Sequence, residues 1–349
     1  MKRGLVLLLV ILMIVLSIVG CGSKDAATGQ KDKQNVIELK LHHHDPPNSI
    51  IGRFFTSWAN EIQHKTNGKV KVTIFPGASL GSPKDAYNMV SSGVCDIAWG
   101  FVGLHPGQFP MTEAVGLPML GVKNTVSGSL ALWDLYQNTD YLKKEYQQVH
   151  VLALHVHAPA PIGAKRKIEK AEDLQGLKLR SPGGPPMDFL KHLGGTPIGM
   201  PPGEIYEAAG KGVIDGWMID PMGVDNYKLP EVTKYILDAK IYVGPFWILM
   251  NKAKWDSLPE DAKKVIAELS GTAAIEKIAR EIDGVDQNVE KQVAANNGLK
   301  YPLSESEAKK WQESAKAIWS KWANDMTAKG YPANDVLAKT QELVKKYNK

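Results

Sequence analysis

Residues 198–217, IGMPPGEIYEAAGKGVIDGW, repeat the pattern of residues 80–99, LGSPKDAYNMVSSGVCDIAW. In both copies a proline, an acid and a tyrosine are followed by a glycine, a valine and an aspartate, and a tryptophan comes shortly after. A proline and an acid are typical of the first turn of a helix, and a glycine is typical of its C-terminal cap. Each copy therefore predicts a helix followed at once by a strand. Two such units more than a hundred residues apart predict two lobes of related build.

Aromatic and polar residues follow the aspartate in each copy, where the two predicted strands end and face each other across a cleft. We expect the cleft to be lined by Trp99 and Phe101 from one lobe, by Trp217, Ile219 and Asp220 from the other, and by Phe246 and Trp247 from a strand that crosses between them. Two alternatives stay open. Trp99 and Trp247 can instead pack the lobes, and Asp220 is either an acceptor for a ligand hydroxyl or amine or a turn acid before Pro221.

Arg180 closes a short predicted strand, because apolar and basic residues alternate in Leu177-Lys178-Leu179-Arg180. The next residues, SPGGPP (181–186), cannot continue that strand. Ligands of open α/β sheets bind at such strand ends. A guanidinium there offers a planar fork that matches a carboxylate and stays charged at ordinary pH. Position alone favours an ion pair with a surface acid, but the predicted cleft favours a ligand role.

Hydrophobic periodicity predicts further elements outside the repeat. We expect strands over residues 36–41, 68–75, 149–156 and 241–250, the last two crossing between lobes, and helices over residues 53–65, 259–296 and 305–329. The last helix carries Trp311, Ile318, Trp319 and Trp322 at helical spacing. Such spacing is typical of helix packing, so we interpret these residues as structural.

Histidines gather at two of the predicted strands. His42-His43-His44 end the first strand, and His155 and His157 share one face of another. Consecutive histidines point in alternating directions and lack the usual spacing of metal ligands, which argues against a metal site. We expect His44 and Asn48 to be polar contacts of the cleft instead, and we expect no cofactor.

The N-terminal residues predict export. Lys2 and Arg3 precede an apolar run, and Ile18-Val19-Gly20-Cys21 resembles a lipobox, so residues 1–20 are predicted to be a signal peptide and Cys21 the lipidated residue. An uncleaved membrane anchor is the alternative. Residues 21–35 are then the lipidated cysteine and a polar, flexible tether. The mature chain is expected outside the cytoplasm, in the periplasm or on the outer face of the cytoplasmic membrane.

Charge and cysteine content argue against a nucleic-acid-binding protein and against a disulfide-stabilised one. The chain has 42 basic and 37 acidic residues, and removing the signal peptide leaves 40 basic ones. This small excess, without a basic stripe and interleaved aromatics, argues against nucleic-acid binding. After lipidation of Cys21 only Cys95 remains, so no intramolecular disulfide can form. Cys95 lies in an apolar run and is predicted to be buried and inert.

Residues 171–182, AEDLQGLKLRSP, resemble the signature of solute receptors of tripartite ATP-independent (TRAP) transporters, the DctP type. Matching blocks follow in order along nearly all of the mature chain, at residues 75–77, 80–81, 93–96, 109–110, 117–118, 204–206, 212–216, 231–232 and 250–259. The resemblance implies an α/β, periplasmic-binding-protein-like fold with two lobes, crossing strands and a long helix that spans both. We place residues 36–157 and 245–284 in lobe I, and residues 158–244 and 285–349, with the C-terminal helices, in lobe II.

The resemblance also implies a function. Such receptors capture an organic acid through an arginine at the position of Arg180 and deliver it to ion-gradient-driven membrane subunits. Many members have a second arginine upstream, where this chain has Ala160, and Arg166 is expected on a solvated turn. This departure disfavours a dicarboxylate or a sialic-acid-like ligand. The aromatic cleft residues favour a monocarboxylate with an apolar or aromatic body.

Three other classes of protein are alternatives to a TRAP receptor. The chain has no catalytic triad order, nucleophile elbow, phosphate loop or paired carboxylate motif, so an enzyme is not expected. A substrate-binding lipoprotein of an ATP-driven importer shares the lobes and the lipobox, and only the motif set separates it from a TRAP receptor. If the chain were a sensor lipoprotein without a transport role, the predicted arginine in the cleft would have no explanation.

Overall fold

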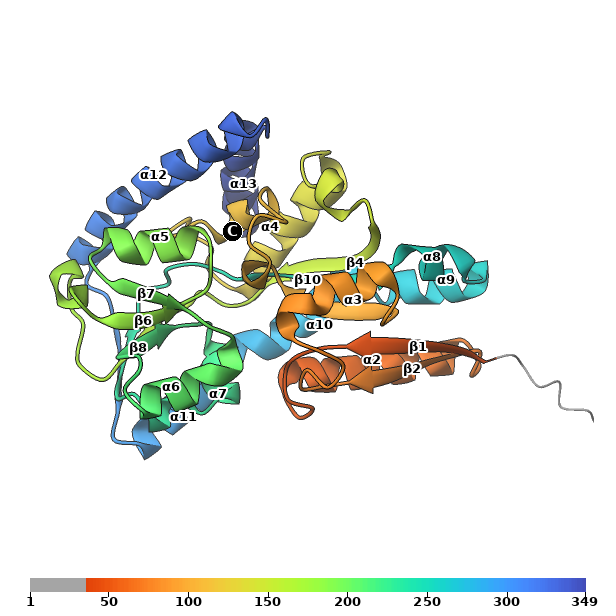
Figure 1. Ribbon diagram of the computed structural model, residues 1–349, viewed down its shortest axis with the longest axis horizontal. Coiled ribbons are helices and arrows are strands. Elements are labelled where there is room, and N and C mark those ends of the chain that lie inside the picture. Colours follow the sequence, from red (N-terminus) through yellow and green to blue (C-terminus); the bar gives the residue numbers. More distant parts are fainter. Residues whose placement is uncertain (1–35) are drawn as a thin grey trace, which may run out of the picture. The chain divides into compact units, whose positions relative to one another are not determined.

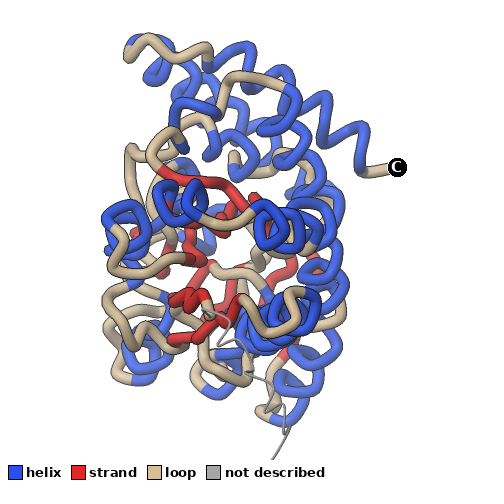
Figure 2. Tube along the Cα trace, turned by 90° about the vertical axis from the view of Figure 1, so that its right-hand side faces the viewer, coloured by secondary structure: helices blue, strands red, loops and turns tan. Residues whose placement is uncertain are grey.

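Two β-sheets flanked by helices organise residues 36–349, the part of the chain that the computed structural model describes (Figure 1). Seen from the side, the strands lie between outer helices (Figure 2). This arrangement confirms the predicted α/β class with two lobes, each built on one sheet. The predicted signal peptide, Cys21 and the tether lie outside the described residues.

The first sheet has the strand order β2-β1-β3-β10-β4. Its strands are β1 (Ile37–His42), β2 (Val70–Phe75), β3 (Ile97–Phe101), β4 (Val149–Val156) and β10 (Pro245–Asn251). β1 pairs in parallel with β2 and β3, whereas β10 runs antiparallel to both β3 and β4. The carboxyl ends of β1, β3 and β4 therefore lie at the same edge as the amino end of β10.

The second sheet has the strand order β11-β9-β5-β8-β6-β7. Its strands are β5 (Ile162–Ala164), β6 (Lys178–Ser181), β7 (Thr196–Gly199), β8 (Gly216–Met218), β9 (Tyr235–Asp238) and β11 (Leu299–Pro302). β6 pairs in parallel with β7 and β8, and β5 runs antiparallel to β8. This repeats the first sheet, in which parallel strands adjoin one antiparallel strand.

Helices cover both sheets. They are α2 (Ile50–Lys65), α3 (Ala86–Ser92), α4 (Thr125–Asn138), α5 (Pro185–His192), α6 (Ile205–Gly210), α7 (Pro221–Asn226), α8 (Lys252–Ser257), α9 (Glu260–Glu268), α10 (Gly271–Asp283), α11 (Asp286–Ala295), α12 (Glu305–Ala328) and α13 (Ala333–Tyr347). α2 begins three residues before the predicted start, because the Ser49 side chain caps it by accepting from the Gly52 amide. The predicted helix over residues 259–296 is three helices, with breaks next to Gly271, whose φ is +55°, and at Gly284.

The internal repeat has the same structure in both lobes. Asp96 precedes β3, and its carboxylate accepts the backbone N–H of Lys40 at 2.7 Å. Asp215 precedes β8, and its carboxylate accepts the backbone N–H of Lys178 at 2.8 Å. Each aspartate thus fastens the start of one strand to its parallel neighbour. The glycines before them, Gly93 and Gly212, have φ angles of +82° and +74°, which L side chains rarely adopt.

The chain passes between the two sheets through residues 157–161 and 239–244, and these two segments are hydrogen-bonded to each other. The His157 amide donates to the Gly244 carbonyl at 3.1 Å, and the Ala160 amide donates to the Tyr242 carbonyl at 2.8 Å. The Ile241 amide returns a bond to Ala160 at 3.0 Å. The strand predicted over residues 241–250 is therefore part crossing segment and part β10, which begins at Pro245.

α12 is the long helix that spans both lobes. Its Trp311 and Ile318 pack into the core of the second lobe, whereas Trp322 packs into the core of the first. The partly buried Trp319 donates its indole N–H to the Pro118 carbonyl at 2.7 Å. α13, which we expected to accompany lobe II, packs against α4 beside the first sheet.

Two properties of the described residues bear on function. None of their helices combines the length and the apolar character required for a membrane crossing. Cys95 is a free thiol and fully buried, as predicted, and burial together with the adjacent Asp96 raises its pKa to about 12.

Candidate ligand-binding site

Arg180 lies at the carboxyl end of β6 and is 1% exposed. Its Nε donates to the Met200 carbonyl and its Nη1 to the Met218 carbonyl, both at 3.1 Å. Met200 and Met218 stand at or just beyond the ends of β7 and β8, the strands on either side of β6. Nη2 is buried, and no group of the described residues bonds to it. The guanidinium is thus fixed on one side, with one nitrogen left for an anion.

Trp99, Phe101 and Phe246 form an aromatic wall on one face of the first sheet. Trp99 and Phe101 are alternate residues of β3, and Phe246 on β10 pairs with Phe101 in register. The Phe246 ring stacks on Trp99 with centroids 4.8 Å apart and on Phe101 at 4.8 Å. His44 stacks on Trp99 at 4.6 Å, and His157 stacks on Phe246 at 3.7 Å. The rings of the wall thus stack on one another and on two histidines, and all three wall residues are buried.

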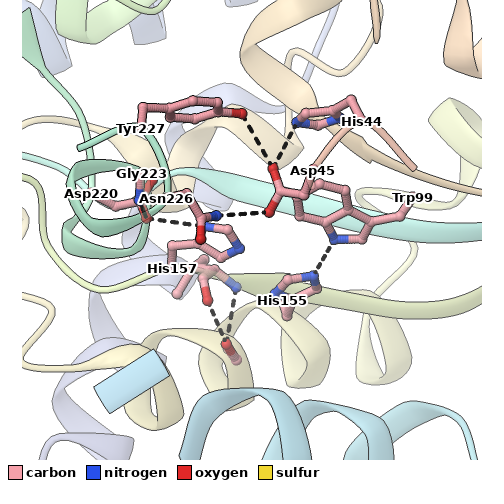
Figure 3. A network of polar contacts seen from close by, with 11 residues as sticks. His44, Asp45, Trp99, His155, His157, Asp220, Gly223, Asn226 and Tyr227 are labelled. Atoms are coloured by element: carbon pink, nitrogen blue, oxygen red, sulfur yellow. Dashed lines mark hydrogen bonds and ion pairs between the residues drawn. The ribbon is translucent and has the colours of Figure 1, made fainter. Parts of the chain in front are cut away.

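Polar contacts join this wall to α7, a helix of the second lobe (Figure 3). His157 Nδ1 lies 3.2 Å from Asp220 Oδ1, and Asp220 caps α7 by accepting the Gly223 amide at 3.2 Å. The indole N–H of Trp99 donates to His155 Nε2 at 3.0 Å. Because an indole nitrogen can only donate, that imidazole nitrogen carries no proton.

Asp45 makes a second connection to α7. Its Oδ2 accepts from Asn226 Nδ2 at 3.3 Å, and its Oδ1 lies 3.5 Å from the Tyr227 hydroxyl and 3.9 Å from His44 Nε2 (Figure 3). Asn226 is the last residue of α7, and Tyr227 follows it. The loop after β1 and the end of α7 therefore meet at one buried carboxylate.

Burial sets the charge states in this network. It lowers the pKa of His43 to about 4 and, with neighbouring histidines, that of His44 to about 3, so both are neutral near pH 7. Burial and the nearby Asp220 raise the pKa of Asp45 to about 7. Burial also acts to raise the pKa of Asp220, but His157 and the Gly223 amide outweigh it and lower that pKa. Asp220 is thus ionised near pH 7, whereas the carboxyl group of Asp45 titrates near this pH.

Several buried nitrogens near this network have no partner among the described residues. Both ring nitrogens of His42 and of His43 are unpaired, as are Nε2 of His157 and Nη2 of Arg180. Each of these residues is at most 1% exposed. Buried polar groups in native proteins are almost always hydrogen-bonded, so a ligand or ordered water is expected to supply the missing partners.

The sheets approach each other beside Arg180. Phe101 from the first lobe, Pro182 from the second and Tyr242 from a crossing segment line a small cavity of about 20 Å³. Burial raises the pKa of Tyr242, whereas the charge of the neighbouring Arg180 and a hydrogen bond with it act in the opposite direction. Of the aromatic wall, Phe101 lines this cavity, and Arg180 lies next to Tyr242, another of its lining residues.

The structure brings together six of the ten residues predicted to contact a ligand. They are Arg180, Trp99, Phe101, Phe246, His44 and Asp220. Asp45, His157, Tyr227, Asn226 and Tyr242 also border this site but were not predicted as contacts. His155 and His157 were predicted to share one face of their strand. Residues 36–349 contain no group of three His, Cys, Asp or Glu side chains placed to hold a metal ion.

The other four predicted residues make none of these contacts, although Trp217 and Ile219 belong to the same apolar cluster as Trp99 and Phe246. Trp247 points to the opposite face of the first sheet, where its ring covers Gly100 so closely that a Cβ there would lie 2.2 Å from it. Trp217 is buried inside the second lobe and donates to Thr233 at 3.1 Å. Ile219 packs against Gly223, and Asn48 is exposed.

Residues 41–325 match the family described as bacterial extracellular solute-binding protein, family 7 (DctP). The chain belongs to this family. It is 29% identical over 300 residues to the outer membrane transporter protein TsaT of Comamonas testosteroni, covering 84% of this chain and 87% of that protein.

Solved structures of TRAP solute-binding proteins have the same fold. A marine metagenome protein specific for aromatic acid ligands, in complex with metahydroxyphenylacetate, is 31% identical with a TM-score of 0.85, covering 90% of this chain and 100% of that one. A protein of Rhodoferax ferrireducens with copurified benzoate is 28% identical with a TM-score of 0.85, covering 90% and 99%. A protein of Bordetella bronchiseptica with bound mandelate is 25% identical with a TM-score of 0.81, covering 89% and 99%.

These matches identify the chain as a TRAP-type solute receptor of the DctP family and not an enzyme. The family is extracytoplasmic, and the similar receptors bind small organic acids.

Proposed function

We propose that this receptor captures an aromatic monocarboxylate between its lobes and that Arg180 pairs with the ligand carboxylate. The observation that carries the proposal is the buried guanidinium of Arg180, held by two carbonyls while Nη2 has no partner among the described residues. A carboxylate at Nη2 supplies the missing acceptor and the opposite charge. Such charge-assisted bonds are about twice as strong as neutral ones.

The aromatic wall supports an aromatic ligand body. Trp99, Phe101 and Phe246 form a stacked wall, and His44, which stacks on Trp99, is neutral near pH 7 because burial lowers its pKa to about 3. The ligands named for similar receptors, metahydroxyphenylacetate, benzoate and mandelate, each combine one carboxylate with one ring.

Within residues 36–349 the other arginines, Arg53, Arg166 and Arg280, are exposed, and this supports a single carboxylate at Arg180. Ala160 is fully buried in a crossing segment. Arg166 is exposed, and its guanidinium donates to the Asp173 carbonyl at 2.8 Å. A second ligand carboxylate would therefore lie near Asp45 and Asp220 without a cationic partner, and this repulsion disfavours dicarboxylates.

The receptor then delivers the acid to TRAP membrane subunits. In this proposal lobe I (residues 36–157 and 245–284, with α13, which packs against α4) and lobe II (residues 158–244 and 285–328) close over the ligand about the paired crossing segments. Lipidation of Cys21 after removal of residues 1–20 holds the receptor at the membrane surface.

A ligand panel tests the proposal. Thermal unfolding of the full chain is followed with benzoate, 3-hydroxybenzoate and mandelate, and with succinate and glucuronate as matched non-aromatic acids. A ligand at a hundred times its dissociation constant adds about 2.7 kcal/mol to the free energy of unfolding. We expect upward shifts with the aromatic acids alone. Shifts limited to succinate would contradict the single-carboxylate site, shifts limited to glucuronate would contradict the aromatic ligand body, and no shift with any acid would contradict carboxylate capture.

A further inference from the structure

Asp45 is a buried carboxylate of the first lobe whose partners belong to the second. It follows β1, is 3% exposed, and contacts Asn226 at 3.3 Å and Tyr227 at 3.5 Å at the end of α7 (Figure 3). Asp220 caps the start of α7 and contacts His157, so both ends of this short helix touch the first lobe or its crossing segment. Any opening that moves α7 away from β1 breaks the contacts of Asp45 and exposes its carboxyl group to water.

We propose that Asp45 is the latch that closes the lobes over the ligand, and that closing takes up one proton at its carboxyl group. The inference rests on the proposed function, since closing is defined by ligand capture. Asp45 acts through Asn226 and Tyr227, so it is a positioning residue and does not itself hold the ligand.

The charges around Asp45 explain why its carboxyl group binds a proton when the lobes close. Burial is the main cause that raises its pKa to about 7, and the ionised Asp220 adds to the shift, whereas bonds from Tyr227 and Asn226 act in the opposite direction. His44, on the same loop, is neutral near pH 7 because burial lowers its pKa to about 3. Arg180 acts on Tyr227 and Asp220. Among residues 36–349 the ion-pair contact of Asp45 is with His44, which is neutral near pH 7, so no cation of this part of the chain balances an ionised Asp45.

The sign of the pH effect follows from these states. In open lobes Asp45 faces water, where an aspartate has a pKa of about 3.9. The closed form binds one proton more than the open form between these values, so ligand affinity falls as pH rises toward 7 and levels off above it. For a closed-state pKa of about 7, the dissociation constant rises about tenfold from pH 6 to pH 8.

Asp45→Asn isolates this contribution. The amide has the same shape, its oxygen can still accept from Asn226 and its NH2 group can donate to the Tyr227 hydroxyl oxygen, but it binds no proton in this range. Titration calorimetry of benzoate with the full chain, in buffers of different ionisation enthalpy, counts the protons taken up on binding. At pH 6 we expect the native receptor to take up about one proton more than Asp45→Asn, with no difference at pH 8. Asp140→Asn, which removes an exposed carboxylate, is the matched control and should follow the native receptor.

A second variant keeps the test independent of one substitution. Asn226→Asp places another carboxylate against Asp45, so binding should weaken at pH 8 and recover at pH 6 more steeply than in the native receptor.

Equal proton uptake by the native receptor and Asp45→Asn at pH 6, with benzoate bound by both, overturns the latch and leaves the proposed function intact. Failure of benzoate, 3-hydroxybenzoate and mandelate to bind at either pH overturns the proposed function and this inference with it.

Discussion

Replacing Arg180 with alanine should remove most of the ligand affinity. The guanidinium is 1% exposed and has two carbonyl partners, so the ligand carboxylate that joins it becomes buried as well. Removing one member of a buried ion pair costs about 3–5 kcal/mol, because the other charge stays buried without a partner. At about 1.4 kcal/mol per decade, this is a loss of roughly 150-fold to 5,000-fold in affinity.

Two further variants separate charge from geometry. Arg180→Lys keeps a positive charge but loses the planar fork, so we expect an intermediate loss of about 10-fold to 100-fold. Arg166→Ala removes the other arginine of this region, which is exposed and bonds to the Asp173 carbonyl. This control should bind within about twofold of the native receptor, since exposed groups far from a ligand contribute little.

Titration calorimetry measures these affinities, using whichever of benzoate, 3-hydroxybenzoate and mandelate the native receptor binds best. Circular dichroism and ligand-free unfolding temperatures confirm that each variant is folded. The reasoning is refuted if folded Arg180→Ala binds within tenfold of the native receptor. It is also refuted if Arg166→Ala loses more affinity than Arg180→Ala.

Three further predictions concern the wall, the histidines and the repeat. Trp99→Ala should weaken aromatic-acid binding about 10-fold to 100-fold by calorimetry, because a stacking face is lost; an unchanged dissociation constant counts against the wall. Because burial lowers the pKa of His43, protonation below pH 6.5 favours the unfolded chain. The free energy of unfolding should therefore fall from pH 6.5 toward pH 4 by up to about 1.4 kcal/mol per pH unit. His43→Phe should flatten this fall in urea unfolding, and equal slopes would exclude the effect. Asp96→Ala and Asp215→Ala should each lower the free energy of unfolding by about 1.5–3 kcal/mol, since each leaves one backbone N–H unpaired; a gap above about 2 kcal/mol between them contradicts their equivalence.

The repeat made the two lobes predictable because its spacing encodes local structure. Helix starts, the C-cap glycines Gly93 and Gly212, and the aspartates that follow depend on neighbours within a few residues. The broken helix over residues 259–296 shows the limit of such patterns. Its apolar positions continue past Gly271 and Gly284, and these glycines, where the helices break, were not read as helix ends.

The site was predictable where strand alternation decides it. Arg180 and Phe101 stand at or next to strand ends, and Trp99 lies two residues before Phe101 on the same face of β3, so their position in the pattern points to the cleft. Phe246 and Trp247 are neighbours on one strand and must face opposite ways, but sequence alone does not say which faces the ligand. Gly100 is the signal that could have decided it, since only a residue without a Cβ leaves room for the Trp247 ring.

Asp45 was missed for a different reason. It stands before two prolines, a context that predicts a turn. Its partners Asn226 and Tyr227 are about 180 residues away along the chain, and no local pattern links them.

The position of β10 also dictates the order in which the chain can fold. This strand lies between β3 and β4 in the first sheet, yet a ribosome makes it after β5, β6, β7, β8 and β9 of the second. Until residue 251 has been synthesised, β3 and β4 have no strand between them and keep unpaired edges, which favour aggregation. The first lobe therefore cannot finish folding as an N-terminal domain ahead of the second. A fragment limited to residues 36–157 would lack the strand that joins its own sheet.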